Sequence, residues 1–218
     1  MDQQGQSSAD LDWREGAIPV SRRFDDPYFS LNGGLDETRH VFLAGNDLPA
    51  RLRPGFHVAE LGFGTGLNLL ALAQIATVPI RFTSFEAFAM SPDELARAHA
   101  AFPDLADLSA QLRAGWPQRR FTVGQVQAEV IEVDARDGLP AWPGRADAWF
   151  LDGFSPAKNP ELWGEGLMAE VAAHTAPGGT FATYTAAGHV RRALAAAGFA
   201  VTRAPGFAGK RHMSRGQL

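Results

Sequence analysis

Four acidic residues stand at or near the ends of apolar runs that are typical of buried strands: Glu60, Glu86, Asp134 and Asp152. The carboxyl ends of parallel strands meet at one edge of a sheet, and ligands bind there. We therefore expect the four carboxylates to lie around one site. Carboxylates accept hydrogen bonds from hydroxyl and amino groups and attract cations. The pattern favours a ligand that carries both kinds of group.

A glycine-rich turn follows the first of these acids. Residues 62–66 read Gly-Phe-Gly-Thr-Gly and lie between an apolar strand-like run and an apolar helix-like run. Glycine reaches φ > 0 and lets backbone N–H groups approach a ligand closely, and a helix start adds unpaired donors. A dinucleotide-binding turn would read G-x-G-x-x-G, whereas these glycines alternate and an acid precedes them. The turn therefore favours S-adenosylmethionine, which has a sulfonium and an ammonium group, over NAD or FAD. An ordinary tight turn between a strand and a helix is the remaining alternative.

Each acid has an expected role towards this cofactor. Glu86, about twenty residues past the turn, would accept the ribose hydroxyls, and Asp134 would accept the exocyclic amine of adenine. Glu60 would lie near the methionine end, and Asp152 would border the transfer site. For the first three, a helix cap or a surface acid is the alternative. The predicted cofactor-binding residues are Glu60, Gly62, Phe63, Gly64, Gly66, Asn68, Glu86 and Asp134.

The composition is that of an ordinary globular chain. Its 218 residues, 45% of them hydrophobic, suffice for one large α/β domain with appendages. No apolar run approaches the ~18 residues of a membrane span, and the polar N-terminus lacks the features of a secretory signal. We therefore expect a cytoplasmic protein without a membrane partner. The absence of cysteine excludes disulfides, thiolate metal sites and a cysteine nucleophile.

The charge pattern gives two opposing indications about nucleic acid. The net charge of −4 argues against generic affinity for phosphate backbones. Several basic residues nevertheless fall in pairs, and arginine forks suit phosphate oxygens. Solvated surface positions are the alternative for these pairs, which are Arg22-Arg23, Arg51/Arg53, Arg119-Arg120, Arg191-Arg192 and Lys210-Arg211.

The chain divides into three expected parts: a disordered tail over 1–10, an N-terminal appendage over 11–55 with a hairpin and a capping helix, and the main domain over 56–218. In the appendage, Asp36 is a candidate N-cap and Gly45 a candidate helix end. In the main domain, strand-like and helix-like stretches alternate, which predicts an α/β fold with a mostly parallel, doubly wound sheet. We expect strands at 57–62, 80–86, 127–134, 147–152 and 179–185, then an antiparallel pair at 199–204 and 210–215. Helices are expected near 66–76, 91–101, 105–112, 160–174 and 188–197.

Five longer stretches resemble one known family. They are 24–30 (Phe-Asp-Asp-Pro-Tyr-Phe-Ser), 37–46, 60–68, 147–160, with its Leu-Asp-Gly-Phe-Ser-Pro run, and 183–192. With these stretches the chain resembles, nearly end to end, the tRNA 5-aminomethyl-2-thiouridine methyltransferases of the MnmC/MnmD type. That family builds the 5-methylaminomethyl group on the wobble uridine of certain tRNAs. The resemblance implies a Rossmann-like class I methyltransferase fold. One departure is the basic run of the family near the C-terminus, which here reads Ala-Gly-Lys-Arg-His over 208–212.

The resemblance also implies partners. In bifunctional members an FAD-dependent oxidase domain follows and releases the free amine from a carboxymethylaminomethyl precursor. Because this sequence stops at Leu218, we expect only the methyl-transfer half, with tRNA as substrate at its anticodon wobble uridine. A separate enzyme would then supply the aminomethyl precursor.

The implied reaction is an in-line displacement in which a primary amine attacks the methyl group on sulfur. It depends mainly on positioning and needs no metal or covalent nucleophile. Asp152 is the expected catalytic residue, as a base or, as we favour, as an acceptor that orients the amine and stabilises its growing charge. Tyr28, Phe154 and Tyr184 are candidates to stack on the extruded uracil, and Lys158 is a candidate phosphate contact. Core packing and a solvated lysine are the alternatives.

Other functions stay open at this stage. A methyltransferase acting on a small-molecule or protein amine would use the same cofactor residues. The appendage and the long connection over 103–125 argue instead for a macromolecular substrate. A non-catalytic module that senses the cofactor or scaffolds an RNA enzyme is a second alternative, although Asp152 and the glycines are intact. A nicotinamide oxidoreductase is the third, and the glycine spacing disfavours it.

Overall fold

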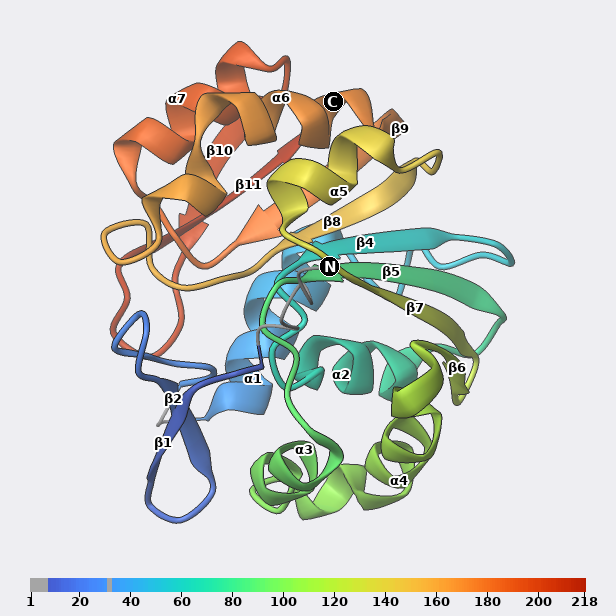
Figure 1. Cartoon of the computed structure of the whole chain (residues 1–218). Coiled ribbons are helices and arrows are strands. Elements are labelled where there is room, and N and C mark those ends of the chain that lie inside the picture. The colour runs from blue at the N-terminus through green and yellow to red at the C-terminus, as the bar shows by residue number, and fades with distance from the viewer. Residues whose placement is uncertain (1–7, 31–32) are drawn as a thin grey trace, which may run out of the picture.

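An eight-stranded sheet forms the centre of the computed structural model, which describes residues 8–30 and 33–218 (Figure 1). Its strand order is β10-β11-β9-β8-β4-β5-β7-β6. The five central strands run parallel, and β6, β10 and β11 are antiparallel to their neighbours. This arrangement confirms the predicted α/β fold with a mostly parallel sheet and an antiparallel C-terminal pair. The strand order reverses beside β4, where β5 lies on one side and β8 on the other, and such a switch point is where ligands bind.

The observed strands agree closely with the predicted ones. The parallel strands are β4 (His57–Leu61), β5 (Ile80–Glu86), β7 (Val126–Glu132), β8 (Ala146–Leu151) and β9 (Thr175–Thr183). The C-terminal pair is β10 (Ala200–Pro205) and β11 (His212–Gln217). One strand of this eight-stranded sheet was not predicted, β6 (Arg120–Val123), which pairs with β7.

The two faces of the sheet are buried in two separate clusters. Along neighbouring strands, Val58 and Phe150 belong to one cluster, whereas Ala59 and Trp149 belong to the other. Successive side chains of a strand point to opposite faces, so a central parallel strand must be apolar at nearly every position. That requirement is why the central strands read as continuous apolar runs.

Helices cover both faces, as Figure 1 shows for α2 to α4 on one side and α5 to α7 on the other. The first group comprises α2 (Leu67–Ile75), α3 (Pro92–His99) and α4 (Ala106–Gly115). The second comprises α5 (Ala135–Ala141), α6 (Glu165–Ala173) and α7 (Gly188–Ala196). Short 3-10 turns complete the connections: η3 (Pro103–Leu105), η4 (Trp116–Gln118) and η5 (Pro160–Trp163). In the described part of the chain, no helix is both long and apolar enough to cross a membrane.

The N-terminal segment folds into a small antiparallel sheet of its own, with β1 (Leu11–Arg14), β2 (Ile18–Ser21) and β3 (Asp26–Pro27). Three helical turns follow: α1 (Gly34–Thr38), the π-helical η1 (Arg39–Leu43) and the 3-10 turn η2 (Ala44–Asn46). The predicted tail lies mostly outside the described residues. Ala9, which we assigned to that tail, is buried, and its N–H faces the carbonyl of Ala89 at 3.4 Å.

Several predicted helix limits are wrong for local reasons. Asp36 is not an N-cap, because α1 begins at Gly34 after the left-handed Gly33 and places Asp36 in its first turn. Gly45 does not end the helical segment, which runs to Asn46 and stops at the left-handed Asp47. The predicted helix over 160–174 is interrupted at Gly164, whose backbone is extended. Helix α5 was missed, because Gly138 and Pro140 lie within its seven residues and disfavour a helix in sequence.

Candidate active site

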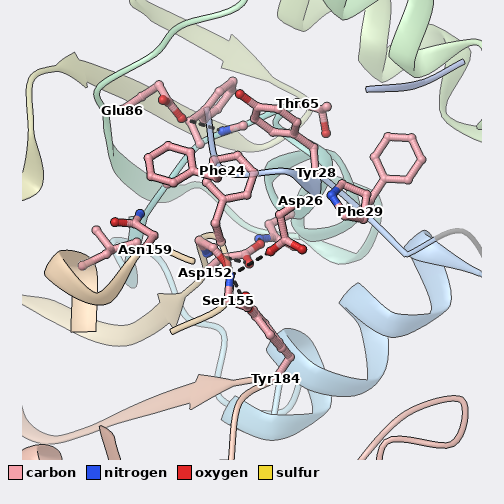
Figure 2. A pocket seen from close by; sticks show the side chains of 18 of the residues that line it. Phe24, Asp26, Tyr28, Phe29, Thr65, Glu86, Asp152, Ser155, Asn159 and Tyr184 are labelled. Atoms are coloured by element: carbon pink, nitrogen blue, oxygen red, sulfur yellow. Dashed lines mark hydrogen bonds between the residues drawn. The ribbon is translucent and has the colours of Figure 1, made fainter. Parts of the chain in front are cut away.

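A cavity of about 550 Å³ opens at the carboxyl edge of the sheet, where β4, β5 and β8 end. Its lining includes Gly62, Glu86 and Asp152 from those three strand ends. A second wall comes from the N-terminal segment, which contributes Phe24 and Tyr28. Figure 2 shows Glu86 and Tyr184 at opposite ends of the view, with Phe24 and Asp152 between them. The volume is within the usual range for a small-molecule site.

The glycine turn after β4 needs its glycines for backbone geometry and close packing. Gly62 and Gly64 have φ of 82° and 55°, values that side chains rarely tolerate. A Cβ on Gly62 would meet the backbone oxygen of Asp152 at 3.2 Å, and one on Gly64 would meet Tyr28 Cδ1 at 3.0 Å. Together with Phe63, both glycines line the cavity. The turn therefore brings bare backbone to the cavity wall.

Gly66 has a different role from the one predicted. It is the left-handed N-cap of α2 and does not line the cavity. A Cβ there would lie 2.6 Å from Phe63 Cζ and 2.9 Å from Leu112 Cδ1. The third glycine thus allows α2 to pack behind the turn, and the structure does not support its predicted contact with the cofactor.

Glu86 ends β5 at the cavity, and backbone donors fix its carboxylate. One oxygen accepts from the N–H of Gly64 at 2.8 Å and the other from the N–H of Phe88 at 2.6 Å. The backbone N–H of Phe63 also interacts with this carboxylate. Since a carboxylate has about four acceptor positions in all, these three donors leave about one for a ligand hydroxyl. Burial raises the pKa of Glu86, and these backbone hydrogen bonds oppose the shift. The geometry agrees with the predicted role as a hydroxyl acceptor, which stays a prediction.

Asp134 lines the cavity and also caps a helix. Its carboxylate accepts from the backbone N–H of Arg136 at 2.9 Å and from that guanidinium at 3.0 and 2.7 Å. The hydrogen bonds from Arg136 hold the pKa of Asp134 below its ordinary value. The alternative reading as an N-cap is therefore correct. The predicted hydrogen bond from adenine would therefore need an acceptor position on the Asp134 carboxylate that Arg136 does not already occupy.

Asp152 follows β8 and is held by a side-chain network. Asn68 Nδ2 donates to Asp152 Oδ2 at 2.8 Å, and Gly153 N–H donates to Oδ1 at 2.8 Å. Asn68 in turn accepts from Thr38 Oγ1 at 3.0 Å. Burial raises the pKa of Asp152 to about 6, against the effect of the two hydrogen bonds. A fixed, ionisable carboxylate thus faces the cavity with one acceptor position free on each oxygen.

Glu60 does not reach the cavity, which corrects its predicted contact with the cofactor. It is fully buried within β4 and accepts from Asn68 Nδ2 at 2.8 Å and from Ser84 Oγ at 2.7 Å. Burial raises its pKa well above the ordinary value. Glu60 therefore positions the amide of Asn68, which itself lines the cavity and holds Asp152.

Aromatic side chains form the wall between these acids. Phe154 stacks on Phe24 with ring centroids 4.6 Å apart and meets the edge of Tyr28 at 4.9 Å. The hydroxyl of Tyr184 donates to the carbonyl of Gly153 at 2.7 Å. All four rings line the cavity. The predicted residues Tyr28, Phe154 and Tyr184 thus come together, and Phe24 joins them.

Lys158 lies outside the cavity lining, and the structure gives it a local partner. Its ammonium donates to the backbone oxygen of Asp25 and lies 3.3 and 3.6 Å from the carboxylates of Asp25 and Asp26. Asp26 also accepts from the N–H of Ser155 at 2.9 Å. Lys158 therefore ties the N-terminal sheet to the loop after β8, and its predicted phosphate contact is not supported.

Four of the paired basic residues that do not line the cavity likewise have acidic partners close by. Arg22 pairs with Asp10 and Asp12, Arg53 with Asp147, Arg119 with Glu132, and Arg120 with Glu129. For these four residues, ion pairs within the protein fit better than a phosphate-binding patch.

Several polar residues that were not among the predicted site residues also line the cavity, and Glu37, Thr38 and Lys210 are three of them. Glu37 and Thr38 begin the stretch 37–46 that resembles the methyltransferase family, and Lys210 is one of two lysines in the chain. These signals could have identified them. They lie on α1 and on the β10–β11 connection, which the fold brings to the cavity.

Comparison with known proteins identifies the class. Residues 102–218 match the family model of S-adenosyl-L-methionine-dependent methyltransferases. The relatives named tRNA 5-methylaminomethyl-2-thiouridine biosynthesis bifunctional protein MnmC from Chromobacterium violaceum and Pseudomonas aeruginosa PAO1 are each 45% identical, over 97% and 95% of this chain. The chain covers 35% of either relative, so it spans about a third of the length of the curated relatives that it matches.

Solved structures agree at the level of fold. MNMC2 from Aquifex aeolicus superposes with a TM-score of 0.76 over 99% of this chain and 71% of that one, at 23% identity. The precorrin-6y C5,15-methyltransferase from Geobacter metallireducens gives 0.56 over 95% and 98%, at 13% identity. At such identities the likeness shows the fold alone.

The chain belongs to the S-adenosyl-L-methionine-dependent methyltransferases, and S-adenosylmethionine is its cofactor. The cavity fits this group in volume, in the bare backbone of the glycine turn and in the free acceptor positions of Glu86 and Asp152. The prediction of this cofactor over NAD or FAD is confirmed.

Proposed function

We propose that the protein methylates the primary amine of a 5-aminomethyl group on the wobble uridine, or 2-thiouridine, of tRNA. The proposal rests on the 45% identity to relatives named for biosynthesis of 5-methylaminomethyl-2-thiouridine and on the chemistry of the cavity. The observation that carries it is the fixed carboxylate of Asp152 beside an aromatic wall. A carboxylate suits an amine acceptor, and aromatic rings suit an unpaired base.

S-adenosylmethionine supplies an electrophilic methyl group on a positively charged sulfur. The residues of the chain then need to hold the amine in line with that group and support the charge that grows on nitrogen. Asp152 is ionised for the most part at neutral pH, because its pKa is about 6. Its free acceptor positions would orient the N–H bonds of the amine. An alkylammonium ion, with a pKa of roughly 10, is too weak an acid for Asp152 to deprotonate efficiently. The ammonium therefore releases its proton to solvent before its nitrogen attacks the methyl group, and we assign Asp152 an orienting role towards the neutral amine.

The aromatic wall would bind the base that carries the amine. Burial raises the pKa of both Tyr28 and Tyr184, so both phenols stay neutral at physiological pH. Neutral rings stack on uracil and do not compete with Asp152 as bases. The stacking interaction would hold the C5 substituent beside the carboxylate.

The proposal also concerns partners and location. The chain aligns with one part of longer bifunctional relatives, so the aminomethyl precursor would come from another enzyme activity. Action on tRNA would place the protein in the cytoplasm.

The test uses the purified protein with methyl-labelled S-adenosylmethionine and tRNA from cells that lack the final methylation. The tRNA is digested, and the labelled nucleoside is identified by mass spectrometry. Label in 5-methylaminomethyluridine or its 2-thio form supports the proposal. If tRNA with the free aminomethyl group stays unlabelled while a small-molecule or protein amine gains the label, the substrate assignment is wrong.

A further inference from the structure

The cavity that contains Asp152 also contains the carboxylate of Glu37, which the mechanism above does not use. Glu37 comes from α1, and its side chain is only 12% exposed. One of its oxygens accepts from Lys210 Nζ at 2.6 Å. That ammonium also lies 4.7 Å from the centroid of the Tyr184 ring. Glu37 and Tyr184 therefore form a two-sided site for a cation, and Lys210 fills it.

The Lys210 group that fills this site has the same chemical structure as the proposed acceptor. A lysine side chain ends in a methylene carbon that carries a primary ammonium, which is also the structure of a protonated 5-aminomethyl substituent. A carboxylate supplies a charge-assisted hydrogen bond, and an aromatic face adds attraction for the cation. The protein thus holds a primary alkylammonium from its own chain inside the cavity where the acceptor amine must bind.

Glu37, Lys210 and Tyr184 line the same cavity as Asp152. The two charges also affect Asp152: Glu37 raises the pKa of its carboxyl by charge repulsion, and Lys210 lowers it. The Lys210 side chain is 49% exposed and belongs to the connection between β10 and β11, so it can leave the site without unfolding a strand.

We propose that Glu37 binds the primary amine of the acceptor, which displaces Lys210 from Glu37 and Tyr184 and so comes to lie beside Asp152. This inference rests on the proposed function, because it assigns a subsite to that acceptor. Lys210 fills the subsite with an equivalent charge until the substrate arrives. Glu37 then selects a cationic C5 substituent over a neutral one, and the bound ammonium releases its proton to solvent before its nitrogen attacks the methyl group.

The test compares Glu37→Gln and Lys210→Met with wild-type protein and with Glu165→Gln, an exposed acid in the first turn of α6. KM and kcat for tRNA bearing 5-aminomethyluridine are measured at saturating cofactor, and cofactor affinity is measured separately. Loss of a charge-assisted hydrogen bond should raise KM of the Glu37→Gln variant roughly tenfold or more. Loss of the internal competitor should lower KM of the Lys210→Met variant. Cofactor affinity and the Glu165→Gln control should stay near wild type.

The proposal predicts a raised KM for Glu37→Gln and a lowered KM for Lys210→Met. These opposite changes distinguish it from a purely structural role of the ion pair. If Glu37 and Lys210 only fasten the β10–β11 connection to α1, both substitutions break the same contact and change KM in the same direction, which overturns the proposal. An unchanged KM for Glu37→Gln also overturns it. Should Glu37→Gln fail to fold, Lys210→Met still decides, since a raised KM contradicts displacement. If wild-type protein labels no amine-bearing tRNA, the proposed function itself fails.

Discussion

The two ends of the cavity are constructed in different ways. At the Glu86 end, neighbouring parallel strands supply the groups, and backbone N–H donors from Gly64 and Phe88 hold the carboxylate. At the Asp152 end, the groups come from α1, α2, the end of β8 and the β10–β11 connection. There a side-chain amide, that of Asn68, links Asp152 to the buried Glu60.

This structural difference suggests that the two ends of the cavity have different functions. Backbone donors are set by the turn itself, so the Glu86 end keeps its shape when a distant side chain changes. The Asp152 end depends on side chains that several segments bring together, and one substitution there alters a network. We therefore expect the Glu86 end to govern cofactor affinity and the Asp152 end to govern methyl transfer.

The largest expected effect is on methyl transfer in the Asp152→Asn variant. Removal of the charge leaves the growing positive charge on the amine unsupported, so kcat should fall roughly 100-fold or more. Cofactor affinity should change little. Rates are measured with aminomethyl-bearing tRNA at saturating cofactor, and Asp104→Asn, an exposed acid in η3, serves as the control. Near-normal turnover of Asp152→Asn at high pH would show that its charge is not needed.

A smaller effect is expected on cofactor affinity in the Glu86→Gln variant. The amide keeps one acceptor oxygen but cannot accept on both sides, and it leaves the N–H of Gly64 or Phe88 without its carboxylate partner. The dissociation constant for S-adenosylmethionine should rise roughly tenfold or more, as measured by calorimetry. An unchanged constant would place the ribose elsewhere.

The pH dependence of the free energy of unfolding gives a further test of Asp152. Burial raises its pKa from 3.8 to about 6, so the folded state favours the protonated carboxyl more than the unfolded state does. This group therefore lowers the free energy of unfolding as pH rises through that interval. Without cofactor, the stability of Asp152→Asn relative to wild type should therefore rise by on the order of 1 kcal/mol between about pH 4 and pH 7. The altered hydrogen bonds to Asn68 and Gly153 add a difference that does not depend on pH. Thermal melts at several pH values measure the difference, and an equal difference at every pH would refute the titration of Asp152.

The smallest effect is expected for Lys158→Met. Lys158 pairs with Asp25 and Asp26 at the protein surface, and such ion pairs contribute about 0–1 kcal/mol. Cofactor affinity and kcat should both stay within about threefold of wild type. A large rise in KM for tRNA alone would instead restore Lys158 as a phosphate contact.

The same contrast explains how far the sequence could predict this molecule. The strands, the glycine turn and Glu86 are specified by residues close in the chain, and their pattern was readable. Gly66 and Glu60 belong to that motif, yet whether a side chain faces the cavity or the interior depends on packing that the pattern does not contain. Glu37 and Lys210 are 173 residues apart, so their pairing depends on the whole fold and left no local signal.

The most direct test of this division is a single-turnover titration of cofactor with wild type, Glu86→Gln and Asp152→Asn, with each enzyme in excess over aminomethyl-bearing tRNA. We predict that Glu86→Gln needs more cofactor but reaches a plateau rate within about threefold of wild type. Asp152→Asn should saturate at the wild-type cofactor concentration with a plateau roughly 100-fold lower. If both variants lose plateau rate by the same factor with unchanged half-saturation, the two ends of the cavity do not have separate roles.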